Sequence, residues 1–233
     1  MFVDSMVIDF FTNEMALVKI NGKADSITTE KYHISAYPTS VMIRKNGEEI
    51  DRVVGYMKPE AFLQKLRDYS NGIGTLDDLL AKNADNFTRE IAFEIGEKYK
   101  YRGGQEEASS WFQKVIDTGD PIDSLSGESR MALASVPYRN KDYDGAIKDY
   151  EAIMKDFKGT PFAEESEIWR AYIFKRKGDT ATAITAFEAF VEHYPESEDV
   201  EWVEKQISNL KGEENKEKPK EESKEGSKGE KEG

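Results

Sequence analysis

The chain has 233 residues, of which 34% are charged, and a formal net charge of −13, so it can form one or two domains that each bury a core. Its acidity argues against nucleic-acid binding, because affinity for phosphate backbones comes from clustered Lys and Arg. No apolar run approaches the ~20 residues of a membrane-spanning helix, so we expect no membrane span.

The first forty residues carry short helix and strand patterns. Residues 4–14 have apolar side chains at helical spacing behind Asp4 or Ser5, either of which is a suitable N-cap. Residues 16–20 form an apolar run that predicts a short buried strand. Residues 26–33 predict a second short helix.

A hairpin and a longer helix follow. Pro38 fits neither a helix interior nor a central strand, so the chain turns there. Residues 40–44 and 49–54 predict two strands joined by an Asn46-Gly47 turn, since both turn residues tolerate positive φ. Pro59 opens a helix whose apolar stripe is Phe62, Leu63, Leu66 and Tyr69. This order predicts an α/β arrangement with helices on both faces of the sheet.

The stretch from residue 32 to 55 resembles the second half of a thioredoxin domain: a helix end, Tyr37-Pro38-Thr39, a strand, an Asn-Gly turn, and a strand closing on Gly55. The opening Phe2-x-Asp4-x-x-Val7 resembles the step after the cysteine helix in the thiol:disulfide interchange type. In that family the strand before the cysteines is central, between the strands matching 16–20 and 40–44. Without it, we expect those two strands to pair directly or the sheet to expose an edge.

The chain contains no cysteine. Disulfide exchange needs a thiolate nucleophile and a second, resolving thiol, so we expect no catalytic residue and no oxidoreductase activity. Two interpretations stay open: a shortened product or fragment of a redox-active parent, or a lineage that lost its redox centre and kept the domain for binding. The resemblance implies a bacterial-type parent in cell redox homeostasis. As given, the chain is expected in the cytoplasm; a longer parent with a signal peptide would be periplasmic or secreted.

The resemblance also implies a peptide-binding site. In the thioredoxin family the matching proline is cis, and the residue before it presents its backbone to an extended peptide. Carried over, Tyr37, Pro38 and Thr39 would form a peptide-docking loop. The alternative is a tight turn before a strand, which we favour for this chain because the cysteine half of the groove is missing.

A repeat begins after a connecting segment at residues 71–86. Each of three segments has a small residue, an alanine twelve residues on, and an aromatic residue four after that; the pairs are Gly96/Ala108, Ala134/Ala146 and Ala171/Ala183. This pattern, over about residues 87 to 195, resembles tetratricopeptide (TPR) repeats and implies a stacked array of helical hairpins. The alanines recur every 37 or 38 residues, which predicts extended loops between hairpins.

The end of the chain predicts a cap helix and a charged tail. Val200, Val203, Ile207 and Leu210 form one apolar stripe, and residues 211–233 are almost entirely Lys, Glu, Gly and Ser, which predicts disorder. The fold class is therefore α/β plus all-α. A truncated thioredoxin-like fold (1–70) and a connecting segment (71–86) precede a TPR-like array (87–210) and a disordered charged tail (211–233).

The candidate residues for a TPR groove are Tyr101, Arg130, Tyr138, Arg139 and Arg170. Their partner would be a protein or peptide client, because the inner face of such arrays usually receives one. The alternative is that the repeats only pack on the first domain. We therefore expect either a protein related to thiol-disulfide exchange that acts by binding, or a non-enzymatic interaction scaffold; neither predicts an oligomeric state.

Metal and cofactor sites find no support in the sequence. His33 and His193 are the two histidines, 160 residues apart, and cysteine, the other common transition-metal ligand, is absent. Tryptophans 111, 169 and 202 fall at helical spacing, which favours packing over ligand stacking. We expect neither a metal ion nor a cofactor.

Overall fold

A computed structural model describes residues 4–217, with side chains described through residue 212. The chain divides into two compact units, Met1–Val136 and Pro137–Gly233. None of the described helices combines the length and the apolar character that crossing a membrane requires.

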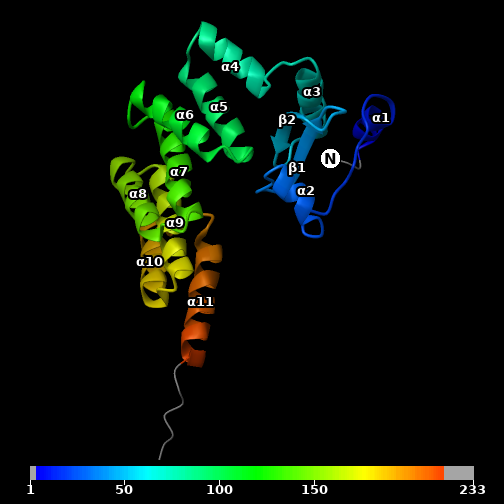
Figure 1. The fold of residues 1–233 in the computed structure, drawn as a ribbon. Coiled ribbons are helices and arrows are strands. Elements are labelled where there is room, and N and C mark those ends of the chain that lie inside the picture. The colour runs from blue at the N-terminus through cyan, green and yellow to red at the C-terminus, as the bar shows by residue number, and fades with distance from the viewer. Residues whose placement is uncertain (1–3, 218–233) are drawn as a thin grey trace, which may run out of the picture. The chain divides into compact units, whose positions relative to one another are not determined.

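The first unit begins with five short elements (Figure 1): α1 (Ser5–Asn13), α2 (Ser26–Lys31), β1 (Thr39–Ile43), β2 (Glu49–Val54) and α3 (Pro59–Ser70). The predicted first helix is confirmed, with Asp4 as its N-cap accepting from the N–H of Met6 at 2.9 Å. The predicted hairpin is also confirmed. Its strands pair antiparallel, and Gly47 in its turn has a φ of 86°, a value that glycine adopts without strain.

One hydrophobic core unites α1, α3 and the hairpin. It contains Val7, Phe10, Met42, Val53, Phe62, Leu63, Leu66 and Tyr69, so the stripe predicted for α3 is buried throughout. By contrast, α2 buries none of its residues, and Ile27 is 79% exposed. The expectation of helices covering both faces of the sheet is thus wrong for α2, because a sheet of only two strands gives this helix little to cover.

The strand predicted at residues 16–20 does not form. This segment has no regular structure, and its apolar side chains lie open, with Leu17 47%, Val18 78% and Ile20 45% exposed. A strand needs a neighbour for its backbone N–H and C=O groups, and the sheet in the described residues consists of β1 and β2 alone. The segment does not pair directly with β1, so the other expected outcome, an open sheet edge, applies.

Four helices complete the first unit: α4 (Leu76–Asp85), α5 (Arg89–Tyr101), α6 (Gln105–Asp117) and most of α7 (Ser124–Arg139). The connecting segment is thus largely helical. The helices α5 and α6 approach each other closely, because a Cβ added at Gly96 would lie 2.8 Å from Cε1 of Phe112. Phe112 itself is buried.

The second unit takes up the end of α7 and continues through α8 (Tyr143–Asp156), α9 (Pro161–Lys177), α10 (Thr180–His193) and α11 (Val200–Glu217). Successive helices from α8 to α11 pack on one another. The residues of the repeat pattern that lie in these helices are buried: Ala146, Tyr150, Ala171, Ala183 and Phe187. The expected long loops are not general, since only residues 157–160 separate α8 from α9. Part of the repeat spacing lies instead in long helices that begin the hairpins, since α7 has 16 residues and α9 has 17.

The cap helix α11 is confirmed, and it buries Val203 and Leu210 against α10. It runs through Glu217, beyond the predicted start of the tail at residue 211. Lys211 forms an ion pair with Glu188 at 2.7 Å, and Lys and Glu are good helix formers, which explains the extension. Residues 218–233 of the predicted tail lie outside the described residues.

Candidate protein-binding surfaces

The Tyr37-Pro38-Thr39 loop is held firmly where it enters β1. The Tyr37–Pro38 peptide bond is cis. The hydroxyl of Thr39 donates to the carbonyl of Ala36 at 2.8 Å, and the carbonyl of Pro38 accepts from the N–H of Gly55 at 2.8 Å. Gly55 thus lies beside the loop, and the irregularity in the β1–β2 ladder falls elsewhere, between Met42 and Ile43. Tyr37 is 62% exposed.

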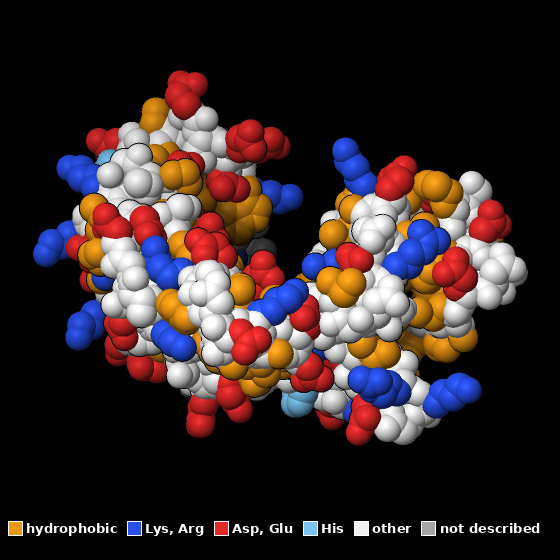
Figure 2. Space-filling view, turned by 90° about the horizontal axis from the view of Figure 1, so that it is seen from above, with side chains coloured by type: hydrophobic (Ala, Val, Ile, Leu, Met, Phe, Trp, Pro, Cys, Tyr) orange, Lys and Arg blue, Asp and Glu red, His pale blue; other side chains and the backbone are white. Residues whose placement is uncertain are grey.

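The outer edge of β1 is open. Hydrogen bonds across an antiparallel pair involve alternate residues. Because Pro38 bonds to Gly55, which directly follows β2, Ser40 faces β2 as well, whereas the N–H and C=O groups of Thr39 and Val41 point away from it. Within the described part of the chain, no hydrogen bond reaches these outward groups of Thr39 and Val41. Figure 2 shows hydrophobic side chains lying on the surface of this thioredoxin-like segment.

The outer edge of β2, in contrast, is closed by side chains. The carbonyl of Ile50 accepts from Nη2 of Arg102 at 3.3 Å, and the carbonyl of Arg52 accepts from the hydroxyl of Tyr69 at 3.3 Å. The sheet therefore offers a free backbone edge at β1 and not at β2.

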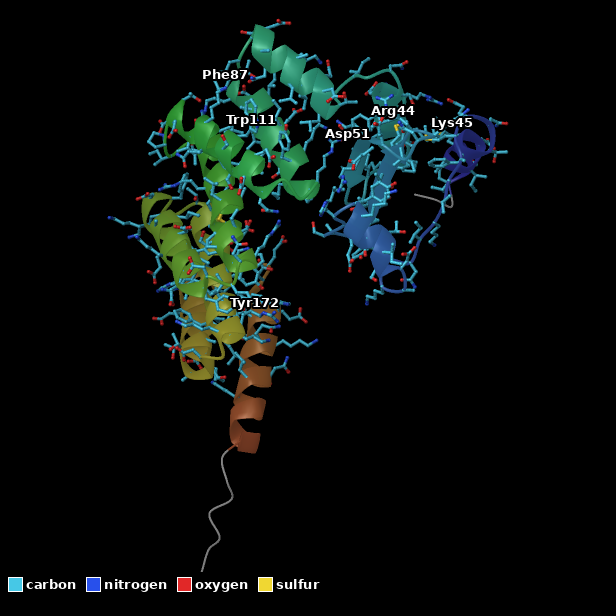
Figure 3. The ribbon with its side chains drawn as sticks, in the orientation of Figure 1. Arg44, Lys45, Asp51, Phe87, Trp111 and Tyr172 are labelled. Carbon is cyan, nitrogen blue, oxygen red and sulfur yellow. The ribbon has the colours of Figure 1, made fainter. Side chains whose placement is uncertain are left out.

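A buried carboxylate joins β2 to the helices that follow (Figure 3). Asp51 is fully buried, and its Oδ2 accepts from Nζ of Lys98 at 2.9 Å and from the N–H of Leu76 at 2.8 Å. Arg102 adds a third contact at 3.3 Å. Burial lowers the pKa of the Lys98 ammonium, although Asp51 acts against this. These contacts fix β2 to the start of α4 and to α5.

A second ion-pair group flanks Asp51. Arg52 pairs with Glu49 and donates to the carbonyl of Tyr101, and Glu49 accepts from Nε of Arg102 at 3.0 Å. Burial alone would raise the pKa of Glu49, but Arg52 and Arg102 together lower it below its ordinary value. Tyr101, a predicted groove residue at the end of α5, thus helps to hold the helical hairpin of α5 and α6 on β2. This helical hairpin therefore packs on the thioredoxin-like segment.

The second unit contains an aromatic cluster, which we define as Tyr138, Tyr143, Tyr150, Trp169 and Tyr172. The ring of Tyr138 lies 5.9 Å from Trp169 and 6.4 Å from Tyr172, and Tyr150 stacks on Trp169 at 6.2 Å. Tyr150 is buried, whereas the other members are half-buried. The cluster therefore packs on a buried ring, and parts of its other rings remain accessible to solvent. Figure 3 labels Tyr172 on α9.

Arginines surround this cluster. Arg170 pairs with Glu151 at 3.5 Å, while its Nε is buried without a hydrogen-bond partner in the described residues. Arg139 and Arg176 are exposed, and neither forms an ion pair within residues 4–212. Burial raises the pKa of the Tyr138 hydroxyl, and the positive charge of Arg176 partly lowers it again. Burial likewise raises the pKa of the Tyr150 hydroxyl, and Arg139 partly lowers it.

The structure thus brings together three of the five predicted groove residues. Tyr138, Arg139 and Arg170 share the second unit, whereas Tyr101 and Arg130 belong to the first; Arg130 is half-buried there. Sequence analysis missed Trp169, Tyr172 and Arg176 as members of the same surface. Their spacing of three and four residues on one predicted helix would have placed them on a common face.

The two histidines lie in different units. His33 is exposed and its ring lies against Gly103, where an added Cβ would be 2.7 Å from Cγ of the imidazole. His193 lies 3.0 Å from a carboxylate oxygen of Glu167, which is buried. Within the described residues, no three His, Asp or Glu side chains group in a way that could hold a metal ion.

Comparisons with protein families match two separate parts of the chain. Residues 4–70 match a family model described as a thioredoxin-like domain, and residues 132–223 match one described as an outer membrane lipoprotein. No curated protein matches the chain. The second match covers the helical hairpins of the second unit and the end of α7. The chain accordingly carries a thioredoxin-like domain followed by a TPR-like helical region similar to the outer membrane lipoprotein family.

Proposed function

We propose that the chain works by binding protein segments through its TPR-like helices, without exchanging disulfides. The observation that carries the proposal is the aromatic cluster of the second unit, flanked by the guanidinium groups of Arg139 and Arg176. Neither group has an ion-pair partner in the described residues. An Arg side chain with free donors is well suited to a carboxylate, which it can bind through two parallel hydrogen bonds.

This chemistry favours an acidic peptide that also carries aromatic residues. The half-buried rings of Tyr138, Trp169 and Tyr172 offer edges and faces for aromatic contacts. Nearby carboxylates already have partners, since Glu151 pairs with Arg170 and Glu165 accepts from Nε1 of Trp169 at 3.3 Å. The rest of the chain is strongly acidic and would repel such a peptide. This repulsion favours binding at the arginines.

The test is a titration followed by fluorescence anisotropy. The probes are a labelled Asp-Glu-Phe-Asp-Glu-Phe peptide and its neutral counterpart Asn-Gln-Phe-Asn-Gln-Phe. The acidic peptide should bind at least about tenfold more tightly, and the double variant Arg139→Ala/Arg176→Ala should lose about tenfold in affinity, equivalent to about 1.4 kcal/mol. Arg44→Ala is the matched control, because Arg44 is an exposed arginine of the first unit. Equal affinity for both peptides would overturn the proposal.

The lack of cysteine sets a second requirement. Reduction of insulin disulfides by a dithiol mechanism consumes two thiols of the enzyme, so the purified chain should show no turnover in that assay. Measurable turnover would contradict a function based on binding alone.

The Tyr37-Pro38-Thr39 loop is proposed as a second docking site, for an extended segment. The open edge of β1, which begins in this loop, and the exposed ring of Tyr37 support this role. Added strands bind through main-chain hydrogen bonds and do not require the missing thiols.

A further inference from the structure

We infer that the open edge of β1 takes up residues 16–20 of a second copy of this chain as an added strand. The inference rests on the docking role proposed for the Tyr37-Pro38-Thr39 loop and identifies the segment that docks there. It is independent of the arginines of the second unit.

The edge of β1 requires a polypeptide backbone as its ligand. The outward N–H and C=O groups of Thr39 and Val41 have no hydrogen-bond partner in the described residues, and only an extended strand presents alternating groups at the matching spacing. The outer edge of β2 offers no such site, because Arg102 and Tyr69 already bond to its carbonyls. Any strand that joins this sheet therefore joins it at β1.

Residues 16–20 have the properties of a strand that could join this edge. Their sequence, Ala-Leu-Val-Lys-Ile, has four apolar residues out of five, and the β-branched Val18 and Ile20 are favoured in strands. Its length equals the five residues of β1. The segment nevertheless has no regular structure, and Val18 is 78% exposed. Adding it to a sheet would bury these side chains and pair its backbone.

A second copy supplies this strand by a reciprocal exchange. Within one chain, residues 16–20 do not pair with β1 in the structure. In a two-fold dimer each copy would donate its residues 16–20 and accept the same segment from the other copy. Every β1 edge would then be paired, and no edge would remain to add further copies. Charge does not oppose the pairing: Lys19 is the one charged residue among residues 16–20 and 39–43, so no like charges face each other across the strands.

The first test measures the mass of the chain in solution. Light scattering after size-exclusion chromatography, from about 1 to 100 µM, should show a dimer for the unchanged chain and a monomer for Val18→Lys. The matched control is Ile27→Lys, because Ile27 is an apolar residue of nearly equal exposure, 79% against 78% for Val18, but lies on α2. Both positions are exposed, so neither change should unfold the monomer. A monomer at every concentration, or a dimer that survives Val18→Lys, would overturn the inference.

The second test uses the absence of native cysteine. A Val18→Cys chain mixed with a Val41→Cys chain under mild oxidation should form a disulfide-linked pair, since both positions are the midpoints of the two strands. Ile27→Cys mixed with Val41→Cys should not. If Val18→Cys/Val41→Cys in one chain instead forms an internal disulfide as a monomer, the strand comes from the same copy and the inference fails.

The proposed docking role of the loop can be judged separately. A labelled peptide with the sequence of residues 14–22 is titrated onto the Val18→Lys chain, which keeps the β1 edge. Binding of this peptide together with a monomeric unchanged chain would support docking at the edge and overturn the second copy as its source. Absence of both binding and dimer would overturn the docking role as well.

Discussion

Asp51 and Lys98 form a buried ion pair of 2.9 Å across 47 residues of sequence. Asp51 lies on β2 of the thioredoxin-like domain, and Lys98 lies on α5 of the first helical hairpin. The same carboxylate accepts from the N–H of Leu76, which begins α4. One buried acid therefore fixes the junction between the two kinds of structure within the first unit.

Removing the charge of Asp51 should destabilise this junction. Asp51→Asn keeps the shape of the side chain but leaves Lys98 and Arg102 without their buried anion, and breaking such a pair costs about 3 to 5 kcal/mol. We expect a corresponding loss in the free energy of unfolding of the first unit, measured by urea denaturation with Trp111 fluorescence in a Trp169→Phe/Trp202→Phe background. Asp9→Asn, at an exposed position, is the control. A loss no larger than that of the control would show that Asp51 does not hold the junction.

The stability of the first unit should fall at acid pH. The pKa of Glu49 is lowered against burial by Arg52 and Arg102, and a hydrogen bond from Arg89 lowers the pKa of Asp123. A depressed carboxylate pKa stabilises the folded state above the unfolded pKa of about 4, and this stabilisation is lost as the pH falls through the lower folded pKa.

The free energy of unfolding should therefore stay level between about pH 7 and 5 and decline below about pH 4. Urea denaturation at several pH values measures the profile. Glu49→Gln/Asp123→Asn should be less stable at neutral pH and show a flatter profile. An acid decline as steep as in the unchanged chain would mean that other groups cause it.

Two helical glycines should respond differently to substitution by alanine. At Gly96 the new Cβ would meet the buried ring of Phe112 at 2.8 Å, whereas at Gly212 it meets nothing within 4 Å. Overpacking at Gly96 costs about 1 to 3 kcal/mol, partly offset by about 1 kcal/mol of helix propensity. Gly212→Ala gains the propensity alone. Thermal unfolding should show a lower Tm for Gly96→Ala and an unchanged or higher Tm for Gly212→Ala; the same sign for both would contradict the close approach of α5 and α6.

Local periodicity in the sequence was enough to predict much of the fold. The stripe of α3 and the small residues of the repeats, such as Gly96 and Ala183, report burial through spacing along one helix. The Asn46-Gly47 pair likewise predicts a hairpin turn from two adjacent residues alone. Such features need no knowledge of distant residues.

Features that depend on distant partners could not be predicted. Residues 16–20 have a strand-like composition, yet a strand exists only where a neighbour accepts its hydrogen bonds. Asp51 lies in a charged stretch, and only the fold shows that Lys98 meets it. The extension of α11 depends in part on the ion pair of Lys211 with Glu188 on α10.

The candidate site was predictable in part for the same reason. Tyr138 and Arg139 are adjacent in sequence, but their meeting with Trp169 on α9 is a tertiary contact. Arg139 was a candidate groove residue, and it is exposed. Tyr101 was assigned to a groove, whereas its carbonyl serves the ion-pair group around Arg52.

The most direct test of the binding account is the salt dependence of acidic-peptide affinity. The Asp-Glu-Phe-Asp-Glu-Phe peptide is titrated at about 50 and 500 mM NaCl, between which the screening length shortens severalfold. The account predicts a marked loss of affinity at high salt for the unchanged chain, and weak, nearly salt-independent binding for Arg139→Ala/Arg176→Ala. Affinity that responds to neither the salt nor the loss of these arginines would contradict it.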